Sequence, residues 1–155
     1  MTSTTRAGQF SALPEPQFQV WSKFGNWETV WWPQYLGLQL EELRADYARM
    51  RLAYRPEFRQ PAGVWHGGVI ASMLDTVVVP AVGSAYAEQR DLFTIDMQLR
   101  YLSPLGEEDA VAEGWVVRRG RSIVFCDAEV QSSSGVLAAT ASLVYKVSSR
   151  ARQTP

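Results

Sequence analysis

The sequence predicts an α+β fold in which one antiparallel β-sheet wraps around a long central helix. The first observation is an apolar segment, Val69 to Ala87, whose hydrophobic residues recur at the spacing of one helix face. The second is a change to apolar–polar alternation after Asp91, which is typical of strands. A helix this apolar must be covered on nearly every side, and one curved sheet provides that cover within a single domain over residues 1–155.

An aromatic extension, residues 1–33, precedes this core. Residues 1–16 are expected to be disordered or loosely packed. The aromatic rings that follow recur at helical spacing at Phe24, Trp27 and Trp31, which predicts a short amphipathic helix. Pro33 then marks a break or the start of another turn. We expect these rings to belong to the core or an interface, or to cover the apolar part of a ligand.

The central helix is predicted to follow a β-hairpin and to contain a break. Two strands, Leu36 to Leu43 and Tyr47 to Tyr54, form the hairpin, since apolar and polar residues alternate in its second arm. Pro80 lies inside the helix and cannot donate to the carbonyl of Thr76, so it is expected to kink the helix or end its regular part.

Four strands are predicted after the helix. Alternation is clearest from Phe93 to Tyr101. Turns at 103–106, at Gly120 and at 132–135 separate the other three. These strands are expected over Val111 to Arg119, Ser122 to Gln131, and Val136 to Val147, and residues 148–155 are expected to be a flexible tail.

Composition excludes several classes of protein. Hydrophobic residues make up 46% and charged residues 20% of the chain, and the net charge is −1, with no basic tail of the kind that nucleic-acid-binding proteins often carry. No apolar stretch reaches the ~20 residues that span a membrane, and no signal peptide is evident, so we expect a cytoplasmic protein. One histidine and one cysteine exclude a disulfide framework and make a zinc site improbable.

The residues with the clearest chemical meaning lie at the start of the central helix. Asp75 is the only formally charged side chain between Arg59 and Glu88. Burial of an unpaired charge is unfavourable, so this carboxylate is functional, or else a neighbouring strand satisfies it. Gly67 and Gly68 leave the first N–H groups of the helix open to an oxyanion, or they form only a tight turn. His66 before them is also suited to capping the helix.

Three sequence motifs, in this order, resemble the hotdog-fold thioesterases, specifically the PaaI-like (4-hydroxybenzoyl-CoA thioesterase-type) branch. The first is Gln-Pro-Ala-Gly-Val-Trp-His-Gly-Gly at 60–68, followed by Asp75. The second is Thr-Ile-Asp-Met-Gln-Leu-Arg-Tyr-Leu-Ser-Pro at 94–104. The third is Val-Arg-Arg-Gly-Arg-Ser at 117–122, followed by a strand, a turn and Ala-Ala-Thr-Ala at 138–141. The resemblance runs from about Pro33 to Val147.

The resemblance implies an acyl-CoA thioesterase and a role for each motif residue. Asp75 matches the catalytic carboxylate, which acts as general base or nucleophile. Gly67 matches the residue whose backbone N–H polarises the thioester carbonyl. His66 matches a motif position that shapes the loop, and Gln60 occupies a position near the carbonyl or the water. Thr94 matches a hydroxyl position that, from the partner subunit, helps to hold the water.

The resemblance also implies a homodimer or homotetramer whose active sites lie at the dimer interface, with no metal and no organic cofactor. Gly68 and Ser122 are expected to contact the substrate. The arginines beside the third motif, Arg118, Arg119 and Arg121, are expected to bind the phosphates of coenzyme A, or else to form a solvated hairpin end.

Three other functions remain open. A hotdog protein can bind acyl-CoA, or act as a scaffold, without catalysis. It can also hydrolyse esters of acyl carrier protein, or hydrate enoyl-CoA. The hydratase chemistry usually pairs the aspartate with a histidine a few residues later, and none follows Asp75. The acyl group is not specified by the sequence.

Overall fold

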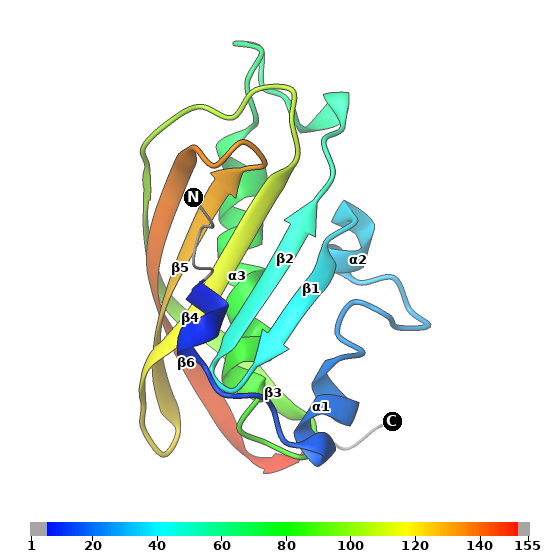
Figure 1. Cartoon of the computed structure of the whole chain (residues 1–155), viewed down its shortest axis with the longest axis vertical. Helices are drawn as coiled ribbons and strands as arrows, with labels where there is room; N and C mark the ends of the chain where they lie inside the picture. The colour runs from blue at the N-terminus through cyan, green and yellow to red at the C-terminus, as the bar shows by residue number, and fades with distance from the viewer. Residues whose placement is uncertain (1–5, 152–155) are drawn as a thin grey trace.

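The computed structural model describes residues 6–151. Six antiparallel strands form one sheet in the order β1-β2-β4-β5-β6-β3, and the sheet curves around the long helix α3 (Figure 1). The predicted order of the core is confirmed. The strands are β1 Gln39–Arg44, β2 Tyr47–Leu52, β3 Arg90–Tyr101, β4 Ala110–Arg119, β5 Ile123–Ser132 and β6 Leu137–Ala151, and α3 spans Gly67–Gly83.

The hydrophobic core lies between α3 and the concave face of the sheet. Met73, Leu74, Val77 and Val78 of the helix are fully buried. Gly114 of β4 allows the closest approach, since a Cβ there would lie 2.8 Å from a methyl group of Val78 and would clash. No helix of residues 6–151 is long and apolar enough to cross a membrane.

The aromatic extension forms short elements in a different arrangement from the predicted one. The structure has two helices, α1 Glu15–Trp21 and α2 Trp32–Leu36, on either side of the segment that was predicted to be helical. Gly25, at φ +87°, is in the left-handed region, and residues 26–31 contain no helix. The prediction for Phe24 to Trp31 is therefore wrong, whereas Pro33 lies in the first turn of α2, which begins at Trp32.

The expected loose packing of residues 1–16 is wrong at Arg6–Gln9, the first element that the structure describes. A 3₁₀ turn, η1 Arg6–Gln9, lies on the outer face of the sheet, and Ala7 in it is buried. Residues 1–5 lie outside the described residues. A second 3₁₀ turn, η2 Pro56–Phe58, follows β2.

A β-bulge in β3 changes which residues face the helix. Thr94 pairs with Tyr145 and Asp96 with Val144, so Ile95 is the extra residue. Because side chains alternate along a strand, this insertion reverses the faces beyond it. Leu92 and Thr94 face α3 before the bulge and Met97 faces it afterwards, whereas Phe93 and Ile95 are exposed. The simple alternation expected from Phe93 to Tyr101 is thus broken.

The last strand is longer than expected. Strand β6 continues to Ala151, where it pairs with Arg90. The predicted tail is therefore strand over 148–151, and residues 152–155 lie outside the described residues. The turn predicted at Gly120 is confirmed by the bond from its N–H to the carbonyl of Ile123, at 2.8 Å.

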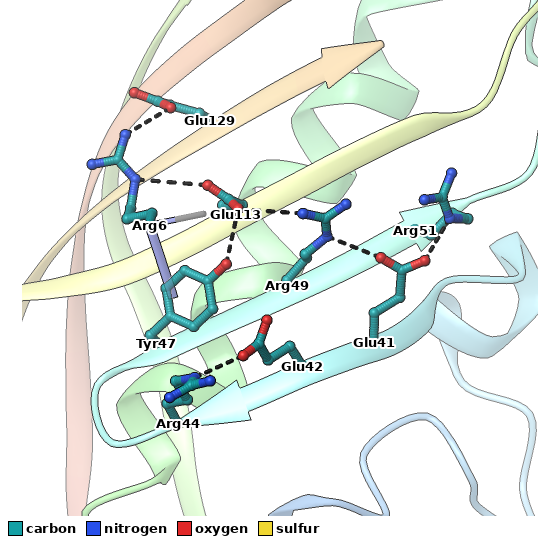
Figure 2. Close-up of polar contacts among 9 residues, drawn as sticks. All are labelled: Arg6, Glu41, Glu42, Arg44, Tyr47, Arg49, Arg51, Glu113 and Glu129. Carbon is teal, nitrogen blue, oxygen red and sulfur yellow. Dashed lines mark hydrogen bonds and ion pairs between the residues drawn. The ribbon is translucent and has the colours of Figure 1, made fainter. Parts of the chain in front are cut away.

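An ion-pair network crosses the outer face of β1, β2, β4 and β5, on the side away from α3 (Figure 2). Glu113, only 6% exposed, accepts from the Tyr47 hydroxyl at 2.9 Å and lies 3.7 Å from both Arg6 and Arg49. Arg6 also bonds Glu129 at 2.9 Å and stacks on Trp115, 3.7 Å from its ring centre. The network fixes η1 on the sheet.

Candidate active site

The N-terminus of α3 has one backbone donor that the protein does not use. The Nδ1 atom of His66 accepts from the N–H of Gly68 at 2.9 Å, which makes His66 the cap of the helix. The N–H groups of Val69 and Ile70 bond the carbonyl of His66. Within residues 6–151 no hydrogen bond involves the N–H of Gly67, so this donor remains available at the positive end of the helix dipole.

A pocket lies beside this donor. The loop after η2 forms a bridge between Arg59 and Trp65, and Gln60, which is exposed, begins the turn beyond this bridge. A cavity of about 450 Å³ is lined by Gln60, Gly67 and Tyr101, among others. Gln60 and Gly67 are therefore brought together, as expected. The Tyr101 hydroxyl donates to the carbonyl of Gly67 at 2.7 Å and holds the first turn in place.

Asp75 lies two turns further along α3 and is half-buried. The Thr94 hydroxyl donates to its Oδ1 atom at 2.7 Å. The Tyr145 hydroxyl lies 2.7 Å from the same oxygen and 2.6 Å from the backbone carbonyl of Asp75. No hydrogen bond to Oδ2 occurs among the described residues, so one carboxylate oxygen is held and the other is free to react.

Tyr145 is a fixed donor. Burial, and after it the charge of Asp75, raise the pKa of Tyr145 well above the ordinary value for tyrosine. The phenol therefore stays protonated at neutral pH and donates to Asp75. Sequence reasoning missed this residue because the alternation of β6 marks position 145 only as inward-facing. One signal in the sequence could have identified it: among the inward-facing residues of β6 from Ala139 to Val147, only Tyr145 carries a polar group at the end of its side chain.

Helix α3 runs antiparallel to β3. Gly67 contacts Tyr101 at one end, and Asp75 contacts Thr94 further along. Asp75 is the eighth residue after Gly67, and eight helical steps correspond to about 12 Å along the axis. A single thioester carbon therefore cannot contact both groups of one copy of the chain.

Thr94 serves the carboxylate of its own chain. The resemblance implies a hydroxyl that reaches an active site from the partner subunit, and the bond to Asp75 means that Thr94 and this carboxylate enter any such site as one unit. The bulge at Ile95 is the structural reason, because it lets Thr94 and Met97 both face the helix.

The expected basic cluster is divided. A bulge at Val117 places Arg118 opposite exposed Phe125 and Arg119 opposite buried Val124, on different faces of the sheet. Arg119 bonds Asp46 at 2.6 Å near the C-terminal end of α3. Arg118, Arg121 and Ser122 are exposed at that same end, whereas Gly67 and Gly68 lie at the other end of the helix. Within one copy they do not share a site.

No group of three or more potential metal ligands occurs in the part of the chain that the structure describes. Cys126 is buried, and burial raises the pKa of its thiol to about 12. It packs as a small hydrophobic residue and is not an activated nucleophile.

A six-stranded antiparallel sheet around one long helix is the hotdog fold. Residues 62–139, half of the chain, match the family model described as the thioesterase superfamily. The chain belongs to this superfamily and is a thioester hydrolase.

Individual relatives agree with this assignment. The chain is 27% identical over 130 residues to the medium/long-chain acyl-CoA thioesterase YigI of Escherichia coli, a match that covers 72% of this chain and 82% of YigI. The structure of a thioesterase family protein from Silicibacter pomeroyi matches with a TM-score of 0.74 at 20% identity, and the match covers 85% of this chain and 97% of that protein's chain. The structure of a thioesterase from Haemophilus influenzae matches with a TM-score of 0.70 at 21% identity, and the match covers 75% of this chain and 81% of that protein's chain.

Proposed function

We propose that this chain hydrolyses acyl-CoA thioesters, with Asp75 as general base or nucleophile and the N–H of Gly67 as the oxyanion donor. The observation that carries the proposal is the half-held carboxylate of Asp75. Two hydroxyls fix its Oδ1 atom and leave Oδ2 free, within a helix that has no other charge. The similarity to an acyl-CoA thioesterase of Escherichia coli supports coenzyme A as the thiol.

The chemistry follows from these groups. Attack on the thioester carbon moves negative charge onto the carbonyl oxygen, where the unused N–H of Gly67 and the helix dipole stabilise it. Oδ2 of Asp75 either takes a proton from the attacking water or forms a mixed anhydride that water then hydrolyses. Coenzyme A thiolate is a good leaving group, and Gln60 beside Gly67 orients the carbonyl or the water.

The separation of about 12 Å along the helix supports an active site made from two copies of the chain. Gly67 and Gln60 of one copy then act on the same thioester as the partner subunit's Asp75 and Thr94. Exposed Phe93 and Ile95, 57% and 55% exposed on the unpaired edge of β3, support an interface there. In such a dimer, Arg118, Arg121 and Ser122 are candidates for phosphate contacts across the interface.

Thiol release from a panel of acyl-CoA esters tests the proposal, with wild type and Asp75→Asn compared. We expect turnover that falls at least about a thousandfold in the variant, because the amide neither takes a proton nor attacks. The oligomer, measured by light scattering, should stay unchanged. A well-folded wild type that releases no thiol from any ester, yet binds them, would instead support a binding role or a carrier-protein substrate.

Mixing two inactive variants tests the shared site. Gly67→Ala places a Cβ 2.8 Å from the Tyr101 hydroxyl and disturbs the donor side, and Asp75→Asn removes the carboxylate. Refolded together at equal amounts, the two should recover up to about 25% of wild-type turnover, because half of random dimers are mixed and hold one intact site of two. No recovery would place both groups in one copy and leave hydrolysis itself unaffected.

A further inference from the structure

Residues 21–32 of the aromatic extension, called the strap below, lie across α3 and are anchored to it at both ends. At one end, Trp21 packs on Gly83, where an added Cβ would lie 2.4 Å from the indole ring, and its Nε1–H bonds the carbonyl of Tyr86 at 2.9 Å. At the other end, the Nε1–H of Trp32 bonds the Ser72 hydroxyl at 3.1 Å. Asp75 lies between these anchors on the helix.

A cavity of about 560 Å³, larger than the pocket beside Gly67, lies between the strap and α3. Apolar side chains from three parts of the chain line it, among them Phe24, Trp27 and Trp31 of the strap, Val79 of α3 and Leu92 of β3, and the polar side chains of Gln89 and Arg90 also line it. Its size falls within the ~300–1,000 Å³ typical of small-molecule sites.

The cavity lies along the same faces of α3 and β3 as the Asp75–Thr94 pair, although neither of these two residues lines it. Val79 is one helical turn after Asp75, so the two residues share one face of α3. Leu92 precedes Thr94 by two residues and lies before the bulge, so these two side chains share one face of β3. Both elements thus continue directly from the Asp75–Thr94 pair into the apolar cavity.

We propose that this cavity holds the acyl part of the thioester, and that the strap selects apolar acyl groups of medium or greater length over short ones. The inference rests on the proposed hydrolysis at Asp75. An acyl chain whose carbonyl lies at Asp75 has its tail directed along Val79 and Leu92 beneath the indole rings. The rings gain apolar contact area that an acetyl group cannot supply. The strap precedes residues 62–139, so the selectivity belongs to this chain's extension and not to the matched core.

Chain-length selectivity tests the proposal. The experiment compares kcat/KM for decanoyl-CoA, phenylacetyl-CoA and acetyl-CoA between wild type and two variants. Val79→Phe fills the cavity, and Trp31→Ala removes a wall residue that is 59% exposed, so that folding does not depend on it. The decanoyl-to-acetyl ratio should fall at least about tenfold in each variant, since burial of several methylenes is lost. The phenylacetyl arm distinguishes an aryl from an alkyl preference.

Val30→Ala is the matched control, because Val30 is 62% exposed, is adjacent to Trp31 and does not line the cavity. Its selectivity ratio should equal that of wild type. Equal losses for acetyl-CoA and decanoyl-CoA in the two cavity variants would overturn the proposal, because they would show that the cavity does not distinguish acyl groups.

A binding measurement separates this proposal from the hydrolysis itself. The S-decyl and S-ethyl thioethers of coenzyme A cannot be hydrolysed, and the wall tryptophans report their binding by fluorescence. Wild type should bind the S-decyl compound at least about tenfold more tightly, and Val79→Phe should abolish most of that preference. A preference without turnover on any ester would retain the cavity and reject the hydrolysis. Equal binding of both thioethers would reject the cavity.

Discussion

At the scale of single residues, the site depends on how one carboxylate is held. Two hydroxyls from different strands converge on Oδ1 of Asp75 and leave Oδ2 unbonded among the described residues. In the proposed mechanism this arrangement orients the oxygen that reacts, because both hydroxyls donate to the other oxygen. His66 caps the N–H of Gly68, so the N–H of Gly67 is the donor that the proposed mechanism assigns to the oxyanion.

The substitution Tyr145→Phe tests this orientation. We expect kcat to fall about tenfold, because Asp75 loses one of its two hydroxyl partners, and the free energy of unfolding to fall by about 1 kcal/mol. Steady-state kinetics and urea unfolding measure the two effects. Tyr47→Phe is the control, because Tyr47 is also buried and also donates to a carboxylate, that of Glu113 on the outer face. A similar loss of kcat in both variants would contradict an orienting role for Tyr145.

At the scale of elements, α3 serves both the core and the site. Its buried residues pack on the sheet, and its open face is covered by the aromatic strap. Gly83 makes the contact between α3 and the strap possible, because only a residue without a Cβ leaves room for the ring of Trp21.

The substitution Gly83→Ala tests this packing, and the structure determines the sign of the effect. Alanine in place of glycine usually stabilises a helix by about 0.5–1 kcal/mol. Here the new Cβ would lie 2.4 Å from the indole ring of Trp21, so we expect a net loss of about 1–3 kcal/mol. Chemical unfolding measures it. Gly106→Ala, where nothing lies within 4 Å, should change stability by under about 0.5 kcal/mol. A more stable Gly83→Ala protein would show that the strap is not held against this residue.

Most elements could be predicted from the sequence because their patterns are local. The helical spacing of apolar residues in α3, and the alternation of apolar and polar residues in β2 and β6, indicate which residues are buried. The bulge at Ile95 could not be predicted, because the extra residue is itself apolar and continues the alternation. The segment from Phe24 to Trp31 has helical spacing for another reason, since its rings line a cavity and Gly25 turns the chain.

Prediction of the site was limited in the same way. Asp75 and the helix start could be recognised because a lone charge and a pair of glycines stand out within an apolar sequence. Tyr145 and Tyr101 could not, because their roles depend on which strand lies beside which turn of α3. The division between Arg118 and Arg119 depends on a second bulge, at Val117.

At the scale of the whole molecule, we expect the free energy of unfolding to fall as the pH rises above 9. Burial raises the pKa of Cys126 from 9.0 to about 12. Above pH 9 the unfolded chain loses this proton and the folded chain keeps it, so the stability contributed by the neutral thiol is complete below pH 9 and is lost as the pH rises towards 12. Burial also raises the pKa values of Tyr47 and Tyr145, and these residues act in the same direction.

Comparison of wild type with Cys126→Ala isolates the thiol, because both proteins keep the tyrosines. Between pH 9.5 and 11, the free energy of unfolding of wild type should fall more steeply than that of the variant, by up to about 1.4 kcal/mol per pH unit. Urea unfolding at several pH values measures the slopes. Parallel slopes would mean that the thiol titrates alike in both states.

The 3₁₀ turn at Arg6 also limits how a second copy of the sheet can stack on the outer face of this one. Through Arg6 and Phe10 it occupies the outer surface over Tyr47, Trp115 and Glu129. A second sheet therefore cannot lie flat on that half of the convex side. Back-to-back stacking is left with the strip formed by β5, β6 and β3, where exposed Phe125 of β5 offers apolar contact together with exposed Val117 at the adjacent end of β4. The short segment ahead of the core thereby acts as a spacer that restricts the possible quaternary geometries.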